Sequence, residues 1–179
     1  VLIRAGFESV GPDMAHLESR RNGEMTPILS GTSLAGVMRA QALRIARTLN
    51  RNEAAAEQFV YQLFGYMPAD RDADKYASKV VVSETAVTGG KKLVQSRVAI
   101  DRFTGGALES ALFEEQPIFG GQTRIQFSIK NPTDAEIGLL LLVLKDLWTG
   151  FITIGGEASV GRGRLRGRQA YICHKEQTW

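Results

Sequence analysis

Pro27-Ile-Leu-Ser-Gly-Thr-Ser-Leu-Ala-Gly-Val-Met-Arg39 is the stretch that decides the fold, because a short apolar run passes there directly into a helix. Apolar residues recur at helical spacing from Leu34 to Leu49, which predicts an amphipathic helix from Thr32 to about Asn50. Thr32 or Ser33 can cap this helix, since a hydroxyl there accepts from the free N–H groups of the first turn. The other predicted elements are described below relative to this helix.

Two further helices and several strands surround it in the predicted order. A second helix is expected over residues 53–64, and a third follows the capping box Thr133-Asp-Ala-Glu136 to about Trp148. Alternating or valine-rich runs predict strands over residues 1–6, 79–87, 94–100, 123–129, 151–154 and 169–172. Residues 7–27 are expected to form a long loop, and residues 101–121 a protruding hairpin or excursion. This order predicts an α+β fold with a mixed or antiparallel sheet and helices on one face.

The composition describes one globular domain, residues 1–179. Of its 179 residues, 44% are hydrophobic and 23% charged, which excludes disordered and collagen-like chains. The longest apolar run, residues 139–144, is too short to cross a bilayer. The single cysteine, Cys173, excludes an internal disulfide and a cysteine zinc site, and fits the cytoplasm. The start at Val1 instead of Met suggests that the domain is one unit of a longer chain.

Residues 161–168 carry the strongest local signal for a ligand, with four arginines and three glycines in eight residues. Glycines let a ligand approach the backbone, and guanidinium groups suit phosphate. The spacing is not that of a dinucleotide-binding loop, and no helix follows it. The alternative is a solvated hairpin whose arginines keep an exposed edge soluble. The residues that would contact nucleic acid are Gly161, Arg162, Gly163, Arg164 and Arg166.

The first helix carries a second basic feature on the face opposite its apolar stripe. Arg44, Arg47 and Arg51 lie on this face with Arg39 at its border, and the helix and the residues after it contain no acidic residue until Glu53. An ordinary solvated face usually mixes charges of both signs. The pattern therefore indicates a surface that follows phosphates, with a plain solvated face as the alternative.

The stretch Arg97-Val-Ala-Ile-Asp-Arg102-Phe-Thr-Gly-Gly-Ala107 mixes basic, apolar and glycine residues on the predicted excursion. Leu112-Phe113-Glu114 follows shortly after it. Apolar wedges on a basic hairpin can unstack bases, which makes Phe103 a candidate wedge. The alternative is a loop folded back on the core with Phe103 buried.

Asp13 is the candidate for acid–base or metal chemistry, since it lies in the irregular segment just before His16. The alternative for Asp13 is a turn aspartate after Gly11-Pro12. His16 could serve as a general base, although a single loop histidine is more often merely solvated. The acidic trio Asp70, Asp72 and Asp74 lacks the later ligands of a calcium loop and is interpreted as surface.

In order along the chain, these segments resemble the RAMP superfamily, and specifically the repeating backbone subunit of type III CRISPR effector complexes. Residues 27–39 are similar to the family's P-x-x-P-G-[ST]-S-[LI]-[KRA]-G-x-x-R, with Ser30 where proline is usual. Leu63-Phe64-Gly65 matches its L-F-G, residues 97–114 its R-x-x-I-D-R-x-T-G-x-A and L-F-x-x-E, and residues 156–167 its glycine-rich ending. The resemblance spans essentially the whole chain.

The resemblance implies a ferredoxin-like, RRM-related domain with a protruding thumb hairpin over about residues 94–121 and a glycine-rich loop. Such subunits stack along a CRISPR guide RNA beside neighbouring RAMP-type subunits or domains, and their thumbs enter the duplex of guide and target RNA. The first helix would contact guide phosphates near Ser33 and Arg39. The full set of expected RNA contacts is Ser33, Arg39, Arg44, Arg47, Arg97, Arg102, Phe103, Gly161, Arg162, Gly163, Arg164 and Arg166.

The resemblance also makes Asp13 the candidate catalytic residue, at the family's separation from Asn22-Gly23. Target RNA would be cleaved with a Mg²⁺ or Mn²⁺ ion bound by Asp13 and assembled mostly from phosphate oxygens and water. His16 would be a weaker second candidate. Two alternatives stay open: a guide-RNA scaffold without catalysis, and an endoribonuclease of the same superfamily that processes the guide precursor. The sequence also leaves open whether the domain is a separate subunit or part of a fused effector.

Overall fold

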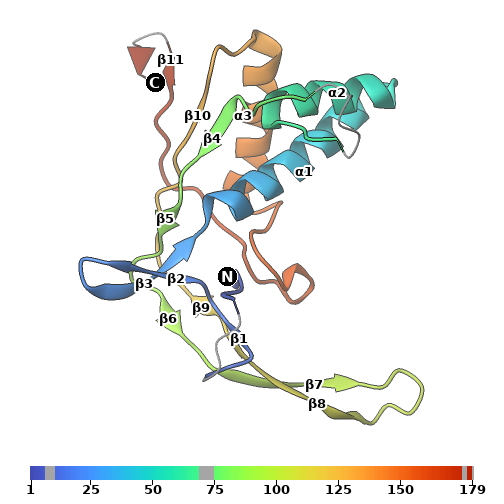
Figure 1. Cartoon of the computed structure of the whole chain (residues 1–179), viewed down its shortest axis with the longest axis vertical. Coiled ribbons are helices and arrows are strands. Elements are labelled where there is room, and N and C mark those ends of the chain that lie inside the picture. Colours follow the sequence, from blue (N-terminus) through green and yellow to red (C-terminus); the bar gives the residue numbers. More distant parts are fainter. Residues whose placement is uncertain (7–10, 69–74, 175–176, 179) are drawn as a thin grey trace.

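The computed structural model describes residues 1–6, 11–68, 75–174 and 177–178. Three helices gather at one end of an elongated molecule, and a long two-stranded hairpin projects from the other end (Figure 1). Short strands join these two ends. The predicted α+β class, with a protruding hairpin, is confirmed. Among the described residues, no helix has the length and apolar character that crossing a membrane requires.

The three predicted helices are all present. They are α1 (Gly31–Leu49), α2 (Glu53–Phe64) and α3 (Asp134–Trp148). The cap of α1 is Ser30, whose Oγ accepts from the Ser33 N–H at 3.2 Å. The prediction of Thr32 or Ser33 as the cap is therefore wrong, because the cap lies two to three residues earlier. The capping box of α3 is confirmed: Thr133 Oγ1 accepts from the Glu136 N–H, and the Glu136 carboxylate accepts from the Thr133 N–H.

The N-terminal segment is more ordered than the sequence suggested. In place of a long loop over residues 7–27, the chain forms β1 (Met14–Ala15), β2 (Glu18–Arg21) and β3 (Glu24–Leu29), with residues 7–10 outside the described part. β2 and β3 pair antiparallel around Asn22 and Gly23, whose φ values are 51° and 87°. Both residues need positive φ in a tight hairpin turn, and Asn-Gly supplies it at low cost.

The remaining strands are short and form small sheets. β4 (Val80–Val82) pairs with β10 (Phe127–Ile129), β5 (Thr85–Ala86) with β3, and β6 (Lys91–Lys92) with β9 (Ile118–Phe119), all antiparallel. β11 (Cys173–His174) pairs with β12 (Gln177–Thr178). The predicted strands over residues 1–6, 151–154 and 169–172 do not form as such. Residues 1–6 and 151–154 instead make isolated bridges, Arg4 with His16 and Thr153 with Arg164.

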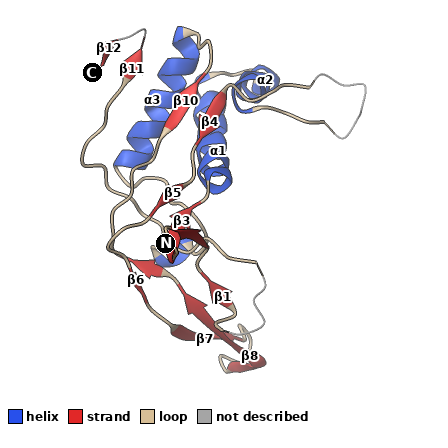
Figure 2. Cartoon of the chain, turned by 60° about the vertical axis from the view of Figure 1, so that its left-hand side comes forward, coloured by secondary structure: helices blue, strands red, loops and turns tan. Residues whose placement is uncertain are grey.

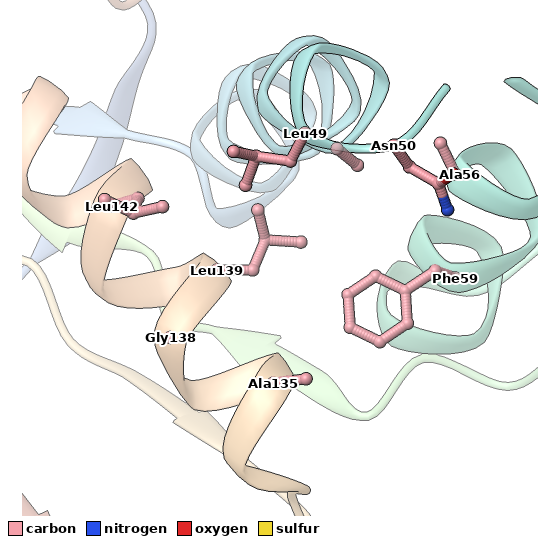
Figure 3. A pocket seen from close by; sticks show the side chains of 9 residues that line it. Leu49, Asn50, Ala56, Phe59, Ala135, Gly138, Leu139 and Leu142 are labelled. Atoms are coloured by element: carbon pink, nitrogen blue, oxygen red, sulfur yellow. The ribbon is translucent and has the colours of Figure 1, made fainter. Parts of the chain in front are cut away.

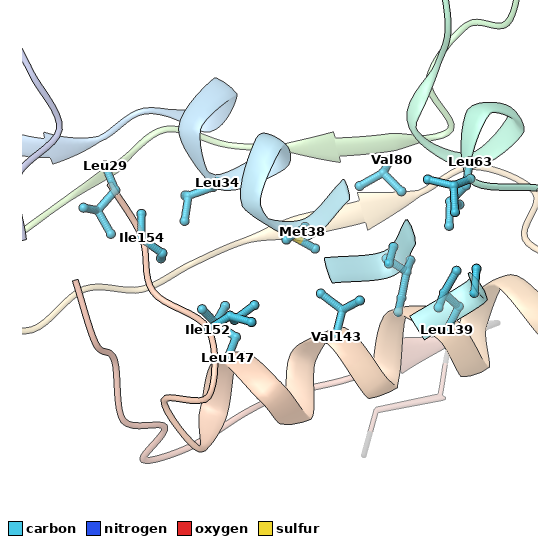
Figure 4. Packing of buried hydrophobic residues seen from close by; sticks show 14 of the residues in the cluster. Leu29, Leu34, Met38, Leu63, Val80, Leu139, Val143, Leu147, Ile152 and Ile154 are labelled. Atoms are coloured by element: carbon cyan, nitrogen blue, oxygen red, sulfur yellow. The ribbon is translucent and has the colours of Figure 1, made fainter. Parts of the chain in front are cut away.

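The hydrophobic core lies between the helices and the extended segments that run beneath them (Figure 4). Leu34 and Met38 of α1 meet Val143 and Leu147 of α3, and Ile154 packs nearby; all five are at most 5% exposed. The apolar stripe predicted from the helical spacing of α1 therefore faces the core along most of its length, whereas Leu49 at its end is 73% exposed. Gln41 Nε2 adds a polar tie by donating to Asp146 Oδ2 at 2.7 Å.

The projecting hairpin consists of β7 (Gln95–Ile100) and β8 (Ala107–Gln116). Its far end extends well away from the helices in both views of the chain (Figures 1 and 2). At its near end, β8 also pairs in parallel with β1, so that Met14 lies opposite Glu115. This hairpin coincides with the predicted thumb, and we use that name for β7, β8 and the turn between them.

Candidate nucleic-acid interface

The tip of the thumb exposes a phenylalanine. Phe103 is 97% exposed, so the alternative in which it folds back into the core is wrong. The turn that holds it is built by Asp101, whose Oδ1 accepts from the N–H groups of Phe103 and Thr104 at 2.7 and 3.3 Å. Gly105 closes the turn with a φ of 67°. The aromatic ring is thus presented to solvent on an ordered support.

More apolar side chains continue along the thumb from this tip. Val98 of β7 lies opposite Leu112 of β8 in the register, so the two side chains share one face of the hairpin. The exposed fractions of Ile100 and Leu112 are 60% and 70%, and Val98 and Leu108 are also exposed. Arg102 lies exposed beside the tip. An exposed apolar ribbon with a basic tip has the character of a surface that contacts unstacked bases.

The glycine-rich loop, residues 155–167, uses most of its glycines for internal packing. A Cβ on Gly163 would lie 2.0 Å from the Ile154 carbonyl oxygen, and one on Gly167 would lie 1.9 Å from the Trp148 ring. Gly155 faces the Leu2 carbonyl oxygen in the same way. Gly161, by contrast, has open space around its Cβ position. The prediction that Gly163 lets RNA approach is therefore corrected, since that residue is buried against its own chain, whereas Gly161 is exposed and its RNA contact stays a prediction.

Arg162 is the largest departure from the predicted interface. Its side chain is 7% exposed, and Nη1 donates to Glu115 Oε2 and to Glu157 Oε2, the latter at 2.9 Å. Nη2 donates to Gln95 Oε1. The guanidinium is therefore committed to groups of the protein itself, and the prediction that it contacts phosphate is corrected.

Arg97 shares in the same network from the thumb. Its Nε lies 3.0 Å from Glu115 Oε2, and its Nη2 lies 3.7 Å from Glu157 Oε2. Burial by itself raises the pKa of Glu115, but the hydrogen bond from Arg162 and the nearby positive charges lower the pKa overall, so the carboxylate stays ionised. Two arginines and two carboxylates thus balance one another at the root of the thumb. The side chain of Arg97 is about one third exposed, and its contact with RNA stays a prediction.

Arg164 and Arg166 are the arginines of this loop that face solvent. A hollow of about 330 Å³ lies between the loop and the root of the thumb, with Arg164 and Gly161 on one side and Phe119 on the other. Arg97 and Arg162 also line it. Because Glu115 and Glu157 balance Arg97 and Arg162, Arg164 is the arginine of this lining that offers an unbalanced positive charge, and Phe119 adds an aromatic group.

The basic face of α1 is partly neutralised by α2. Arg47 lies 3.0 Å from Glu53 Oε1 and also pairs with Glu57, and the hydrogen bond with Glu57 raises the pKa of Arg47. The helix itself contains no acidic residue, but in the folded chain Glu53 and Glu57 of α2 lie against this face. Arg44 remains exposed.

Arg39, at the border of this face, stacks on an aromatic pair. Its guanidinium carbon lies 5.5 Å from the centre of the Tyr61 ring, and Tyr61 stacks on Tyr66 with ring centres 4.2 Å apart. Ser33 is held by Ser30, since Ser30 Oγ donates to Ser33 Oγ at 2.8 Å. Ser33 and Arg39 are both half-buried, at the start of α1 and two turns along it.

Asp13 lies at the root of the thumb and is exposed. Its Oδ2 accepts a hydrogen bond from the Glu114 N–H of β8 at 2.8 Å. The carboxylate is thus anchored to the thumb by one oxygen. The described residues hold no cluster of three or more acidic, histidine or cysteine side chains that could bind a metal ion. Asp13 alone would leave most ligand positions of a Mg²⁺ or Mn²⁺ ion to water and RNA phosphates.

His16 is a structural residue, which corrects both predictions made for it. It is 4% exposed, and its Nδ1 accepts from the Ile3 N–H at 3.1 Å. Its Nε2 therefore carries the hydrogen and donates to the Ile28 carbonyl oxygen at 3.0 Å. Burial lowers the pKa of this imidazole and keeps it neutral. With both nitrogens occupied in the interior, His16 is neither a solvated loop residue nor a general base for RNA.

Sequence reasoning did not single out Glu115, Glu157, Gln95 or Tyr61. Glu115 has an acidic neighbour, Glu114, which is exposed, so composition alone cannot tell the buried carboxylate from the solvated one. The available signal was the alternation of β7 and β8: Gln95 lies opposite Glu115, on the same face as Arg97. Polar and charged residues that share one face of a hairpin indicate that this face meets other polar groups.

The order of elements, the projecting thumb and the glycine-rich loop together define an α+β domain with three helices at one end and a long hairpin at the other (Figure 1). The model of the RAMP superfamily matches residues 6–166, and the chain belongs to that superfamily. A search of curated proteins finds no match. Among solved structures, a chain of a "Type IV-B CRISPR Complex" is similar in fold, with a TM-score of 0.57 and 15% sequence identity, covering 87% of this chain and 84% of that chain.

Proposed function

We propose that this chain is a backbone subunit, or backbone-type domain, of a CRISPR effector complex and binds the guide RNA together with neighbouring RAMP-type subunits in the cytoplasm. The observation that carries the proposal is the ordered thumb, which holds Phe103 97% exposed at its tip. A fully exposed aromatic ring at the tip of a projecting hairpin, next to further exposed apolar side chains, is typical of a surface that contacts a partner. Membership of the RAMP superfamily and the similarity in fold to a CRISPR complex chain support RNA as that partner.

The arrangement of charge supports contact with the RNA backbone. Arg102 lies at the thumb tip, Arg164 and Arg166 lie on the glycine-rich loop, and Arg44 lies on α1, all of them exposed. Exposed arginines bind phosphates regardless of base sequence, whereas stacking on Phe103 tolerates any base. A subunit of this kind holds a guide of arbitrary sequence, and pairing between guide and target supplies the specificity.

Binding of single-stranded RNA of mixed sequence, followed by fluorescence anisotropy as salt is raised, tests this proposal. Affinity is expected to fall as salt increases, with a slope that becomes shallower by about 0.7 for each phosphate contact removed, as in Arg164→Ala. Lys75→Ala, on the surface away from the thumb, is the matched control and should leave the slope unchanged. RNA binding that is absent, or indifferent to salt and to Arg164, would contradict the proposal.

The finer proposal is that the subunit belongs to a type III effector and that Asp13 cleaves the target RNA with Mg²⁺ or Mn²⁺. The position of Asp13 beside Glu114 supports it, because RNA bent by the thumb would pass this carboxylate. In such a reaction Asp13 would hold the metal, which would neutralise charge that develops on the cleaved phosphate. The anchored oxygen Oδ2 sets the direction in which the other oxygen faces.

Asp13→Asn distinguishes this enzyme from a scaffold. The amide keeps the acceptor for the Glu114 N–H and removes only the charge, so guide binding should persist. Target cleavage, measured with labelled RNA in an assembled complex containing Mg²⁺, is expected to be lost. Cleavage at an unchanged rate would leave the scaffold as the function. The alternative of guide-precursor processing is weakened by the burial of His16, and cleavage of precursor RNA in chelator would restore it.

A further inference from the structure

The side chains at the root of the thumb tie together three segments that are far apart in the sequence. Arg162 of the glycine-rich loop donates to Glu115 of β8 and to Gln95 of β7. On the other edge of β8, Met14 pairs with Glu115 and Asp13 accepts from the Glu114 N–H. The loop, the thumb and the segment of Asp13 therefore meet within two consecutive residues of β8.

The thumb has little other support. Most of β7 from Ser96 to Ile100 is exposed apart from Arg97, and the exposed apolar residues lie on the face away from the network. Gln95, Arg97 and Glu115 share the opposite face and are the thumb residues that reach Arg162 or its partner Glu157. The angle between thumb and loop is thus set mainly by directional polar contacts.

Such contacts are an unusual choice if firmness were the sole requirement. Apolar residues of similar volume hold a buried junction as well as a buried ion pair does, or better, because they avoid the cost of removing charges from water. What a guanidinium fork adds is geometry, since it fixes the directions of several acceptors at once. Here one fork holds two carboxylates and one amide oxygen, from β8, from the glycine-rich loop itself and from β7.

We propose that Glu115 and Arg162 are positioning residues that couple the glycine-rich loop to the thumb during RNA binding. This inference rests on the proposed function, in which both surfaces contact the same RNA. RNA phosphates held by the exposed part of the loop, near Gly161 and Arg164, fix the loop. Through Arg162 the loop fixes β8, and the thumb then meets the RNA at one angle. The two contacts therefore strengthen each other.

A double-mutant cycle on the affinity for fluorescein-labelled single-stranded RNA of mixed sequence tests this coupling in the full chain. Arg164→Ala removes a loop contact, and Phe103→Ala removes the thumb tip. In the unchanged chain, the combined loss of affinity should differ from the product of the two separate losses by about fivefold or more. Independent sites would give a product within about twofold.

The same cycle is then repeated in Glu115→Leu/Arg162→Met. This background replaces the pair by apolar side chains and leaves Arg97 and Glu157 as a balanced pair. The coupling is expected to vanish, with the two losses multiplying to within about twofold. A background of Arg21→Met/Glu84→Leu is the matched control, because it removes an exposed ion pair of 2.7 Å outside the root of the thumb, and should keep the coupling.

If circular dichroism shows that the double variant does not fold, Arg162→Lys takes its place. It keeps the charge but cannot span the three acceptors, and the same loss of coupling is expected. Coupling that is absent from the unchanged chain, or that survives in Glu115→Leu/Arg162→Met or in Arg162→Lys, overturns the inference while leaving the proposed function intact. If Arg164→Ala and Phe103→Ala each leave RNA affinity unchanged, the proposed function fails and the inference fails with it.

Discussion

The Nε2–H of His16 donates to the carbonyl oxygen of Ile28 across 3.0 Å, and this bond joins the start of the chain to β3. The opposite nitrogen accepts from the Ile3 N–H, so one neutral ring ties two segments that make no continuous ladder with each other. Protonation would place a hydrogen on Nδ1, where the Ile3 N–H already points. The neutral form of His16 is therefore part of the fold.

This contact predicts a loss of stability in mild acid. Burial lowers the pKa of His16 in the folded protein below its ordinary 6.5. At pH values between the two pKa values, the unfolded chain therefore binds more protons than the folded one. The stabilisation is complete above about pH 6.5 and is lost progressively as the pH falls toward the lower folded pKa. Urea unfolding between pH 7 and pH 5 measures it.

His16→Ala is the variant that checks the assignment. It should cost about 2 to 4 kcal/mol at pH 7, because two buried backbone groups lose their partners. It should also reduce the dependence on pH above 5; the part that remains is expected from the Val1 amino group, whose pKa burial likewise lowers from its ordinary 8.0. A slope that stays the same in His16→Ala would assign the effect to another group.

Two glycines of the same loop are predicted to respond very differently to alanine. Gly163 has a φ of 76° and its Cβ position lies 2.0 Å from the Ile154 carbonyl oxygen, so Gly163→Ala should cost about 3 kcal/mol or more. Gly161 has a φ of 82° but open space, so Gly161→Ala should cost only about 1 kcal/mol. Thermal unfolding of the two variants side by side decides the matter, and equal losses would show that the close packing of Gly163 is not limiting.

The parts of the fold that the sequence predicts well are those specified by neighbouring residues. Helix α1 follows from the spacing of Leu34 and Met38, and the cap of α3 follows from Thr133 and Glu136, three residues apart. The hairpin β2–β3 carried a signal of the same local kind in Asn22-Gly23, but its strands are polar and lack clear alternation. The pattern of apolar residues therefore did not predict these strands, although the Asn-Gly pair indicated the turn between them.

The parts that the sequence could not supply depend on partners far along the chain. Arg162 meets Glu115 across 47 positions, and nothing near Arg162 separates it from the exposed Arg164. The same holds for glycines. Gly161 and Gly163 lie two residues apart, yet only Gly163 packs closely against another part of the chain, the backbone of Ile154. Residue type predicted a phosphate site at this loop, whereas topology decides which of its residues are available to a ligand.

The helix glycines provide a prediction in which stability and binding move in opposite directions. Gly36 is an exposed position of α1 with open space around it, so Gly36→Ala should stabilise the protein by about 0.5 to 1 kcal/mol. If RNA lies against this face of α1, the added methyl group should nevertheless weaken RNA binding by about threefold or more, which is roughly 0.7 kcal/mol.

Gly138 of α3 is the matched control for that prediction. It is also exposed with open space, but it lines an apolar hollow of about 540 Å³ between α1, α2 and α3, beside Leu142 and Phe59 (Figure 3). Gly138→Ala should stabilise the helix by a similar amount and leave RNA affinity unchanged. Weakened binding in both variants would mean that the loss in Gly36→Ala does not report a contact on α1.

Removing the ring at the thumb tip should affect RNA and not the fold. Phe103 is 97% exposed, so Phe103→Ala is expected to change the free energy of unfolding by less than about 0.5 kcal/mol. Loss of one stacked base should weaken RNA binding by about 1 to 3 kcal/mol, and Phe103→Trp should restore it, since any large aromatic face can stack. Chemical denaturation and fluorescence anisotropy measure the two effects. Should Phe103→Ala bind RNA as well as the unchanged chain, the thumb tip would need a partner other than a base, such as the surface of a neighbouring subunit.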